Sequence, residues 1–157
     1  MKYELGEELD GLFRIKALID IGSVAKSGDI GGWVASEKNL SQEGTCWVYG
    51  DAKVFGNAVV YGEARVYGDA RVFGNAVVYG DARVYGNAVV FGDAVVSGNA
   101  RVYGKSMVYG EARVYGDAWV YGKSMVYGEA RVYGDARIYG NARIYGNARV
   151  YGGITLK

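Results

Sequence analysis

The stretch Lys105–Ala118, KSMVYGEARVYGDA, recurs without change at Lys123–Ala136, 18 residues further along the chain. From Val48 onward the sequence consists of hexapeptides of the form V-Y-G-(D/N/E)-A-(R/V). Eighteen consecutive units fit this form, with Val or Ile first and Gly third in every unit. Self-similarity at a fixed short period predicts a solenoid, in which each repeat is stabilised by stacking on its neighbours.

The longer period of 18 residues equals three hexapeptides. It predicts a triangular coil with one hexapeptide on each side, so that equivalent residues such as Phe55, Phe73 and Phe91 stack from coil to coil. Eighteen units make six coils, and a spacing of ~4.8 Å between stacked strands gives a rod about 29 Å long.

Alternation along each strand decides which side chains face the interior. Val and Ala of a repeat share one face, while Tyr and Arg share the other. Burying the second set would place unpaired guanidinium groups in the interior, at a cost of several kcal/mol each. We therefore expect Val, Ile and Ala inside and the aromatic rings outside. The Gly-Asp and Gly-Asn pairs are turn signals and are expected at the corners.

The sequence YGDARVYGNA, residues 79–88, resembles the repeats of the hexapeptide-repeat superfamily, whose members fold as left-handed parallel β-helices. It is most similar to repeat proteins of bacterial and phage genomes that are often labelled transferases because of their fold. Those proteins also carry N-terminal segments like Ile30–Val34, Asn39–Ser41 and Gly44–Val48. The left hand is implied by the resemblance alone, because parallel crossovers are in general right-handed. The fold class expected is all-β: a single-stranded, triangular parallel β-helix with six regular coils and an N-terminal cap.

The composition excludes several kinds of site. The 157 residues include no His and one Cys, and the net charge is +1. A histidine general base, a His-ligated metal site and an intramolecular disulfide are therefore excluded, and we expect neither metal nor cofactor. The net charge does not favour nucleic acid, although that ligand stays open. No apolar run approaches the ~20 residues of a membrane helix, and the polar N-terminus predicts a cytoplasmic protein.

The ends of the chain differ from the repeats. Residues 1–46 are interpreted as a polar cap with a strand or hairpin near Leu12–Ile19 and an irregular first coil, and residues 47–157 as the solenoid. Cys46 holds an inward small-residue position and is expected to pack rather than react. No comparable cap follows Tyr151, so either Lys157 and fraying protect the last coil or a second chain covers it.

The outward residues form three columns, one on each side of the triangle. We call them the first, second and third sides. The first side carries Tyr49, Tyr67, Tyr85, Tyr103, Tyr121 and Tyr139, flanked by Trp47, Arg65, Arg83, Arg101, Trp119 and Arg137; the second carries Phe55, Phe73, Phe91, Tyr109, Tyr127 and Tyr145, flanked by Lys53, Arg71, Val89, Met107, Met125 and Arg143; the third carries Tyr61, Tyr79, Ser97, Tyr115, Tyr133 and Tyr151, flanked by Val59, Val77, Val95, Arg113, Arg131 and Arg149. Rings in register can stabilise the coil as a ladder, and Arg beside Tyr predicts cation–π contacts.

The second side has an apolar centre and a charged rim, which is the composition of a protein interface. We therefore predict that it is buried in a homo-oligomer, either a dimer or a trimer, with the first half of the third side as an extension. The predicted interface residues are Val89, Phe91, Met107, Tyr109, Met125 and Tyr127.

The first side is the predicted binding surface. Rows of Tyr and Arg on a rigid rod offer stacking surfaces and guanidinium groups that bind anions. The residues expected to bind a nucleotide-like ligand or a protein are Tyr103, Tyr121, Arg83, Arg101 and Trp119. The sequence thus favours a non-catalytic, homo-oligomeric recognition protein. The occurrence of similar proteins in phage genomes adds a specific version, a phage inhibitor or ligand-sequestering protein.

Two alternative functions stay open. One is a structural scaffold that polymerises through its last coil. The other is an acyltransferase, which the resemblance implies; those enzymes generally use a histidine base, and this chain has none.

Overall fold

Each hexapeptide forms a two-residue strand followed by a tight turn. In the repeat at Arg83–Ala88, for example, the strand is β10 (Arg83–Val84) and the turn follows at Gly86. The glycines of the repeats have φ between 55° and 70°, a left-handed conformation that side chains with a Cβ disfavour. A residue of this conformation is needed at every corner, which explains why the third position of the hexapeptide is always glycine.

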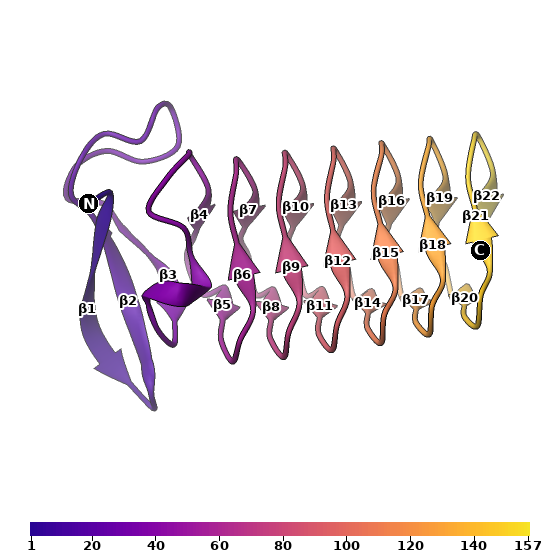
Figure 1. Ribbon diagram of the computed structural model, residues 1–157, viewed down its shortest axis with the longest axis horizontal. Helices are drawn as coiled ribbons and strands as arrows, with labels where there is room; N and C mark the ends of the chain where they lie inside the picture. Colours follow the sequence, from indigo (N-terminus) through magenta and orange to yellow (C-terminus); the bar gives the residue numbers. More distant parts are fainter.

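The computed structural model describes residues 1–157, and from Ile30 onward the chain winds into a left-handed parallel β-solenoid of about seven turns (Figure 1). Strands one coil apart pair in parallel with an offset of 18 residues, as Arg83 with Arg101. This confirms the predicted fold class, the coil length and the three columns. The irregular first turn, which precedes the six regular coils, begins at β3 (Ile30–Val34).

Three sheets form the sides of the triangle. The strands of the first side are β4 (Trp47–Val48), β7 (Arg65–Val66), β10, β13 (Arg101–Val102), β16 (Trp119–Val120), β19 (Arg137–Ile138) and β22 (Thr155–Leu156). The second side has β3, β5 (Lys53–Val54), β8 (Arg71–Val72), β11 (Val89–Val90), β14 (Met107–Val108), β17 (Met125–Val126) and β20 (Arg143–Ile144). The third side has β6 (Val59–Val60), β9 (Val77–Val78), β12 (Val95–Val96), β15 (Arg113–Val114), β18 (Arg131–Val132) and β21 (Arg149–Val150).

The interior is a stack of small apolar side chains. The inward Val, Ile and Ala positions have no exposed surface through most of the rod, as at Val84 and Ala88. Ser106 and Ser124 replace inward alanines, and their hydroxyls donate to the carbonyls of Tyr103 and Tyr121 at 2.8 Å. The interior thus tolerates a serine where the carbonyl of a nearby turn can accept a hydrogen bond from its hydroxyl.

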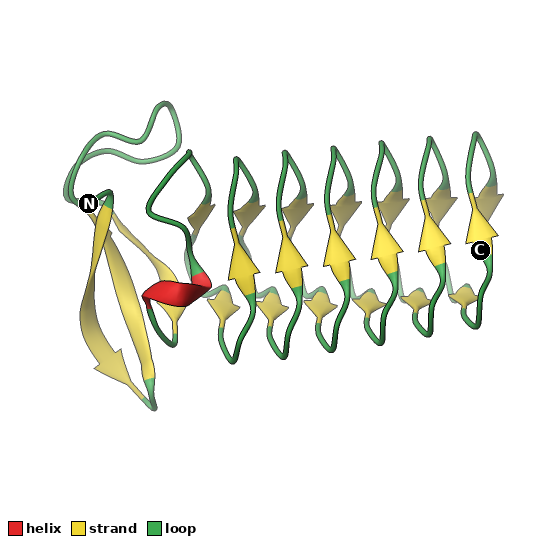
Figure 2. Cartoon of the chain, viewed as in Figure 1, coloured by secondary structure: helices red, strands yellow, loops and turns green.

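An antiparallel hairpin extends the sheet of the second side at its N-terminal end. The hairpin consists of β1 (Tyr3–Leu9) and β2 (Leu12–Ala17), and β2 pairs with β3, which pairs in parallel with β5. A single turn of helix, η1 (Glu37–Asn39), follows β3 (Figure 2). No helix in the chain is both long enough and apolar enough to cross a bilayer.

The N-terminal segment supplies hydrogen-bond donors to carbonyls of the first turns. The Lys2 ammonium donates to the carbonyl of Cys46 at 2.9 Å, and the Tyr3 hydroxyl donates to the carbonyl of Leu40 at 2.5 Å. Cys46 is fully buried, with its Sγ 3.3 Å from the Lys2 ammonium, and its burial raises the pKa of the thiol. The reactive thiolate is disfavoured by this burial, and Cys46 packs in the inward position predicted for it.

At the other end, the side chains of the last coil are more exposed. Tyr145 and Tyr151 are 60% and 53% exposed, and Ile154 is 45% exposed, because no further coil covers them.

Candidate functional site

The tyrosine rings of the first side form a continuous stack. Tyr67, Tyr85, Tyr103 and Tyr121 lie parallel, with successive ring centroids 4.7 to 4.9 Å apart. Each of these rings is half-buried, because its faces are covered by the rings above and below. The ladder therefore presents ring edges and hydroxyls to a ligand, while most of the ring faces are already used in stacking.

Four of the five predicted binding residues come together around Trp119. The Arg101 and Arg137 guanidinium carbons lie 5.4 and 4.2 Å from the centre of the Trp119 ring. Tyr103 and Tyr121 meet the same indole edge-on at 6.2 and 6.5 Å. The guanidinium groups and rings of this cluster already contact one another, and no hollow opens between them, so it is more a structural contact than an open site.

The predicted cation–π contacts between Arg and Tyr are wrong. All three cation–π contacts in the molecule are to tryptophan, at Trp33 and on both sides of Trp119. The physical reason is the ladder: stacked tyrosines cover one another's faces, and a guanidinium needs an uncovered face. The indole of Trp119 lies outside the ladder and leaves its faces free.

Arg83, the fifth predicted residue, borders a different hollow. It lies one coil before Arg101 on the first side, and with Tyr49, Arg65 and Tyr67 it lines a cavity of about 370 Å³. The hollow opens because Tyr49 departs from the ladder. Its ring is turned 80° from that of Tyr67, with the centroids 6.0 Å apart.

Tyr49 belongs to the first hexapeptide, so no earlier tyrosine precedes it in its column. A Cβ at Gly32 would lie 3.1 Å from the carbonyl of Tyr49, so the backbone of Gly32 packs against the backbone of Tyr49. The sequence places Tyr49, Arg65 and Tyr67 in the same column as Arg83, but the periodic pattern predicts another stacked ring at Tyr49. The open hollow could not be read from the pattern.

The electrostatics of the hollow favour an anion. Burial raises the pKa of Tyr49, with the guanidinium groups of Arg65 and Arg83 acting in the opposite direction. The phenol therefore stays protonated at neutral pH and can donate a hydrogen bond, while the two arginines supply the positive charge. The one salt bridge of the molecule joins Arg14 and Asp51 at 3.7 Å, so neither Arg65 nor Arg83 is ion-paired.

Two carboxylates lie on the far side of the same arginines. Glu63 and Asp81 line an adjoining hollow of about 290 Å³ together with Arg65 and Arg83. A hydrogen bond with Asp81, and the charge of Asp81, raise the pKa of Glu63. An anionic ligand would therefore reach the arginines from the tyrosine side, away from this carboxylate pair.

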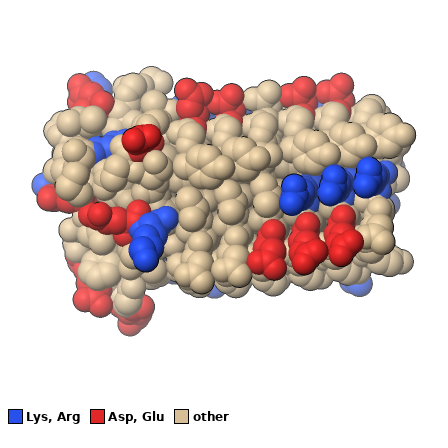
Figure 3. All heavy atoms as spheres, in the orientation of Figure 1, with Lys and Arg blue, Asp and Glu red and all other residues tan.

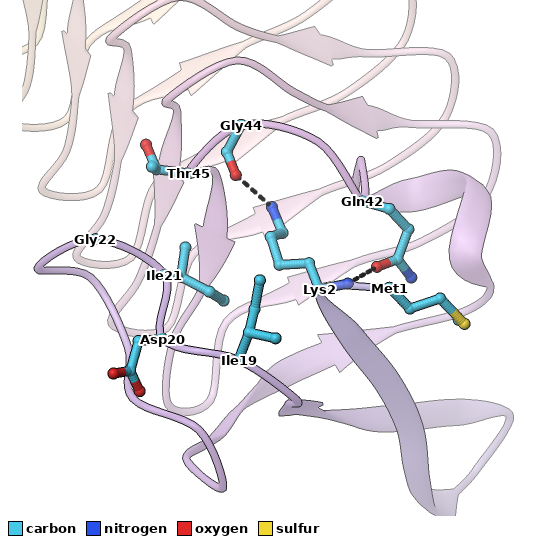
Figure 4. Close-up of a pocket in the computed structure, with 9 residues that line it drawn as sticks. All are labelled: Met1, Lys2, Ile19, Asp20, Ile21, Gly22, Gln42, Gly44 and Thr45. Atoms are coloured by element: carbon cyan, nitrogen blue, oxygen red, sulfur yellow. Dashed lines mark hydrogen bonds between the residues drawn. The ribbon is translucent and has the colours of Figure 1, made fainter.

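The largest hollow lies at the N-terminal end and carries less chemistry. It has a volume of about 620 Å³ and lies between the segment of Ile19 to Gly22 and the start of the chain (Figure 4). Lys2 lines it, but the Lys2 ammonium is directed at the backbone carbonyls of Gly44 and Cys46. Asp20 is the remaining charged side chain of the lining, and this hollow has neither the arginines nor the aromatic rings of the hollow at Tyr49.

The predicted interface residues lie on adjacent strands of the second side. Val89, Phe91, Met107, Tyr109, Met125 and Tyr127 belong to the consecutive strands β11, β14 and β17 or follow them directly. Their rings stack at 4.9 Å between Phe91 and Tyr109 and at 5.0 Å between Tyr109 and Tyr127. All six residues keep part of their surface accessible in the single chain, and their burial between subunits stays a prediction.

Comparison with known proteins identifies the repeat. The repeat described as "YdcK Beta solenoid repeat" matches more than half of the chain, at residues 64–81, 82–98, 96–110, 107–122, 112–128, 130–143, 136–152 and 142–155. A protein of Escherichia coli K12, named "Uncharacterized acetyltransferase YdcK", is 39% identical over 79 residues. The match covers 41% of this chain and 24% of the relative, so the chain corresponds to about a quarter of that protein's length.

Proposed function

The chain belongs to the YdcK β-solenoid repeat family. We propose a function for it from its own surface residues, because the family's name describes a fold and the relative matches over only part of its length. The proposed function is recognition without catalysis: the first side binds a nucleotide-like ligand, in which an aromatic ring and an anionic group lie side by side. Membership of the family accounts for the fold, and the side chains outside the coil account for the ligand.

A single observation carries this proposal. The hollow at Tyr49 and Tyr67 combines two tyrosine rings with the unpaired guanidinium groups of Arg65 and Arg83. Guanidinium groups bind phosphate and carboxylate through paired hydrogen bonds, and the half-buried ring of Tyr49, which is turned out of the parallel stack, offers a stacking surface. The two kinds of group that a nucleotide needs are thus placed around one volume of about 370 Å³.

Acetyl transfer is the second candidate, because the E. coli relative is named an acetyltransferase. The chain corresponds to a small share of that relative, and within its own 157 residues it contains no histidine to act as the general base. We therefore place binding ahead of catalysis for this chain. An acetyl-coenzyme A hydrolysis or transfer assay with the purified chain separates the two, since a binding protein would show no turnover.

The proposal includes a homo-oligomer that associates through the second side. The apolar centre at Met107 and Met125, with charge only at Lys53, Arg71 and Arg143, supports this surface as the interface. Such an assembly would leave the first side free and present several copies of it, which suits a protein that sequesters a ligand, including a phage inhibitor. A scaffold built from the same contacts would assemble equally well but would bind no ligand.

The direct test is titration calorimetry with adenosine monophosphate as the probe. We expect saturable binding to the natural chain and a loss of at least tenfold, or about 1.4 kcal/mol, in the variants Arg83→Gln and Arg65→Gln. Arg143→Gln on the second side is the matched control and should bind as the natural chain does. Absence of saturable binding, or an equal loss in the control variant, would contradict the proposal.

A second set of variants locates the site within the first side. The double variant Tyr121→Ala, Arg101→Ala removes two side chains from the cluster around Trp119, whose members already contact one another. We expect this variant to keep its affinity for the probe if it keeps its fold by circular dichroism. A loss of binding there instead would place the ligand at Trp119, as the sequence predicted.

A further inference from the structure

The row of rings on the third side is interrupted in its middle. Tyr61 stacks on Tyr79 with the ring centroids 4.9 Å apart, and Tyr115 stacks on Tyr133 at 5.0 Å. Ser97 occupies the aromatic position between these two pairs, and it is the one repeat without a ring.

The coil itself is not disturbed at this point. The amide of Ser97 donates to the carbonyl of Val114 at 2.9 Å, and the amide of Ala100 donates to the carbonyl of Ser97 at 3.2 Å. These are the bonds that the other repeats make, so the backbone keeps its register. What is missing is the aromatic side chain alone.

The missing ring leaves a defined space. A cavity of about 230 Å³ is lined by Tyr79, Val95, Ser97, Arg113, Tyr115 and Arg131. Tyr79 and Tyr115 lie two coil steps apart, roughly 9.6 Å at the spacing of stacked strands. One flat ring placed midway would lie at the stacking distance of the ladder from both tyrosines. Val95 and Ser97 are the small residues between them, and Ser97 is only 9% exposed.

One wall of the cavity is positively charged. Arg113 and Arg131 follow each other on β15 and β18, within the row of basic side chains over the C-terminal half of this face (Figure 3). Neither is ion-paired, since the one salt bridge of the molecule lies at Arg14. A row of three carboxylates, Asp93, Glu111 and Glu129, lines a separate hollow with these arginines. The guanidinium groups therefore stand between the acidic row and the gap left by the ring.

We propose that this gap is a binding slot for a single aromatic ring that carries an anionic substituent, either phosphate or carboxylate. The ring completes the ladder between Tyr79 and Tyr115, and the anionic group meets Arg113 and Arg131. The slot lies on a different side of the rod from the hollow at Tyr49, and it does not depend on the function proposed for that hollow.

The experiment uses phenyl phosphate as the probe and saturation-transfer NMR together with calorimetry as readouts. We expect phenyl phosphate to bind the natural chain saturably and at least tenfold more tightly than either inorganic phosphate or phenol. Equal binding of inorganic phosphate would show that the charge alone is recognised and would overturn the slot, as would the absence of saturable binding.

Variants then place the probe in the gap. Ser97→Tyr supplies the missing ring from the chain itself and should abolish binding, whereas Ser97→Ala keeps the space and should retain it. Arg113→Gln should weaken binding at least tenfold, and Arg143→Gln, on the second side, should leave it unchanged. Because the hollow at Tyr49 also combines aromatic rings with guanidinium groups, these titrations are made in the Arg65→Gln background, which separates failure of the slot from failure of the site at Tyr49. Unchanged binding by a folded Ser97→Tyr variant would overturn the proposal.

The melting temperature of Ser97→Tyr shows whether a loss of binding results from misfolding of the variant. A ring that completes the ladder gains two stacking neighbours, so we expect this variant to melt at or above the temperature of the natural chain. A lower melting temperature with loss of binding would count against the geometry of the slot, because the gap would then be too narrow for a ring.

Discussion

Asn39 in the N-terminal cap and Asn99 in the solenoid are the same residue type in two different kinds of structure. The Asn39 side chain accepts from the amides of Ala35 and Ser36 at 2.9 Å, and it donates to the carbonyls of Gly56 and Ala58 at 3.1 and 2.8 Å. Asn99 makes one exposed bond, to the carboxylate of Asp117 at 3.1 Å. The cap concentrates its stability in a few side chains, whereas the coils distribute theirs over many equivalent contacts.

The largest loss of stability is expected when one of these few side chains in the cap is removed. In Asn39→Ala, the amide of Ser36 and the carbonyls of Gly56 and Ala58 lose their partner, while the amide of Ala35 keeps its bond to the carbonyl of Val54. Unsatisfied buried groups cost about 1–3 kcal/mol each before relaxation. We expect a loss of about 3 kcal/mol in the free energy of unfolding, measured by urea denaturation. Asn99→Ala is the matched control and should change stability by less than about 0.5 kcal/mol. Similar losses in both variants would contradict the contrast between cap and coil.

The second comparison is between a glycine in a central coil and a glycine at the equivalent corner near the end of the rod. Gly92 has φ of 66°, and a Cβ there would lie 3.0 Å from the amide nitrogen of Gly110 in the next coil. Gly146 has φ of 64° but nothing within 4 Å. Both alanine variants carry the cost of a left-handed residue, about 1 kcal/mol. We expect Gly92→Ala to lose about 2 kcal/mol in all, because it also presses on its neighbour. Equal losses would mean that the coils separate freely at this corner.

The ring ladder should contribute less per residue than the backbone of the coil. Phe73 stacks on Phe55 at 4.8 Å and on Phe91 at 5.1 Å. Phe73→Ser copies the natural gap at Ser97, and it should cost about 1.5 kcal/mol in a urea titration, since each aromatic pair contributes about 0.5–1.5 kcal/mol. The far-ultraviolet circular dichroism spectrum should not change. Loss of the β spectrum would show that the rings hold the register, contrary to what the intact coil at Ser97 indicates.

The same contrast explains which features could be predicted from the sequence. From Val48 onward a local pattern repeats eighteen times, so the coil, its three sides and its inward face are determined by short-range alternation and turns. The burial of Lys2 against Cys46 and the turned ring of Tyr49 depend on contacts made once, between segments far apart in the chain. A periodic pattern does not predict such contacts, and the turned ring of Tyr49 is what opens the candidate hollow beside Arg83.

The failed prediction of Arg–Tyr contacts has a related cause. The sequence assigns each ring to the correct side of the triangle, but it does not determine whether the face of that ring is covered by a neighbour. Stacking at 4.7 Å between Tyr67 and Tyr85 covers the faces, and only an aromatic residue outside the ladder, such as Trp119, keeps them open. Side-chain orientation within a repeat is therefore a tertiary property even where the backbone is fully periodic.

The smallest effect is expected at an exposed corner where the repeat sets two like charges one above the other. The hydrogen bond with Asp81 raises the pKa of Glu63, so the folded chain holds this proton more tightly than the unfolded chain does. The stability from this proton is fully present below the ordinary pKa of a glutamate, and it is lost as the pH rises through the raised value. Glu63→Gln keeps a hydrogen-bonding group at this position without the second negative charge.

Melting curves between pH 4 and pH 8 measure this difference. The natural chain should lose stability relative to Glu63→Gln as the pH rises, and the variant should melt slightly higher at pH 7. Curves that stay parallel across this range would show that the corner carboxylates do not interact. A difference would mean that even in the coils, where stability is shared among many copies, the choice of a corner residue in one repeat is felt by the same corner 18 residues away, as it is when Asn99 donates to Asp117.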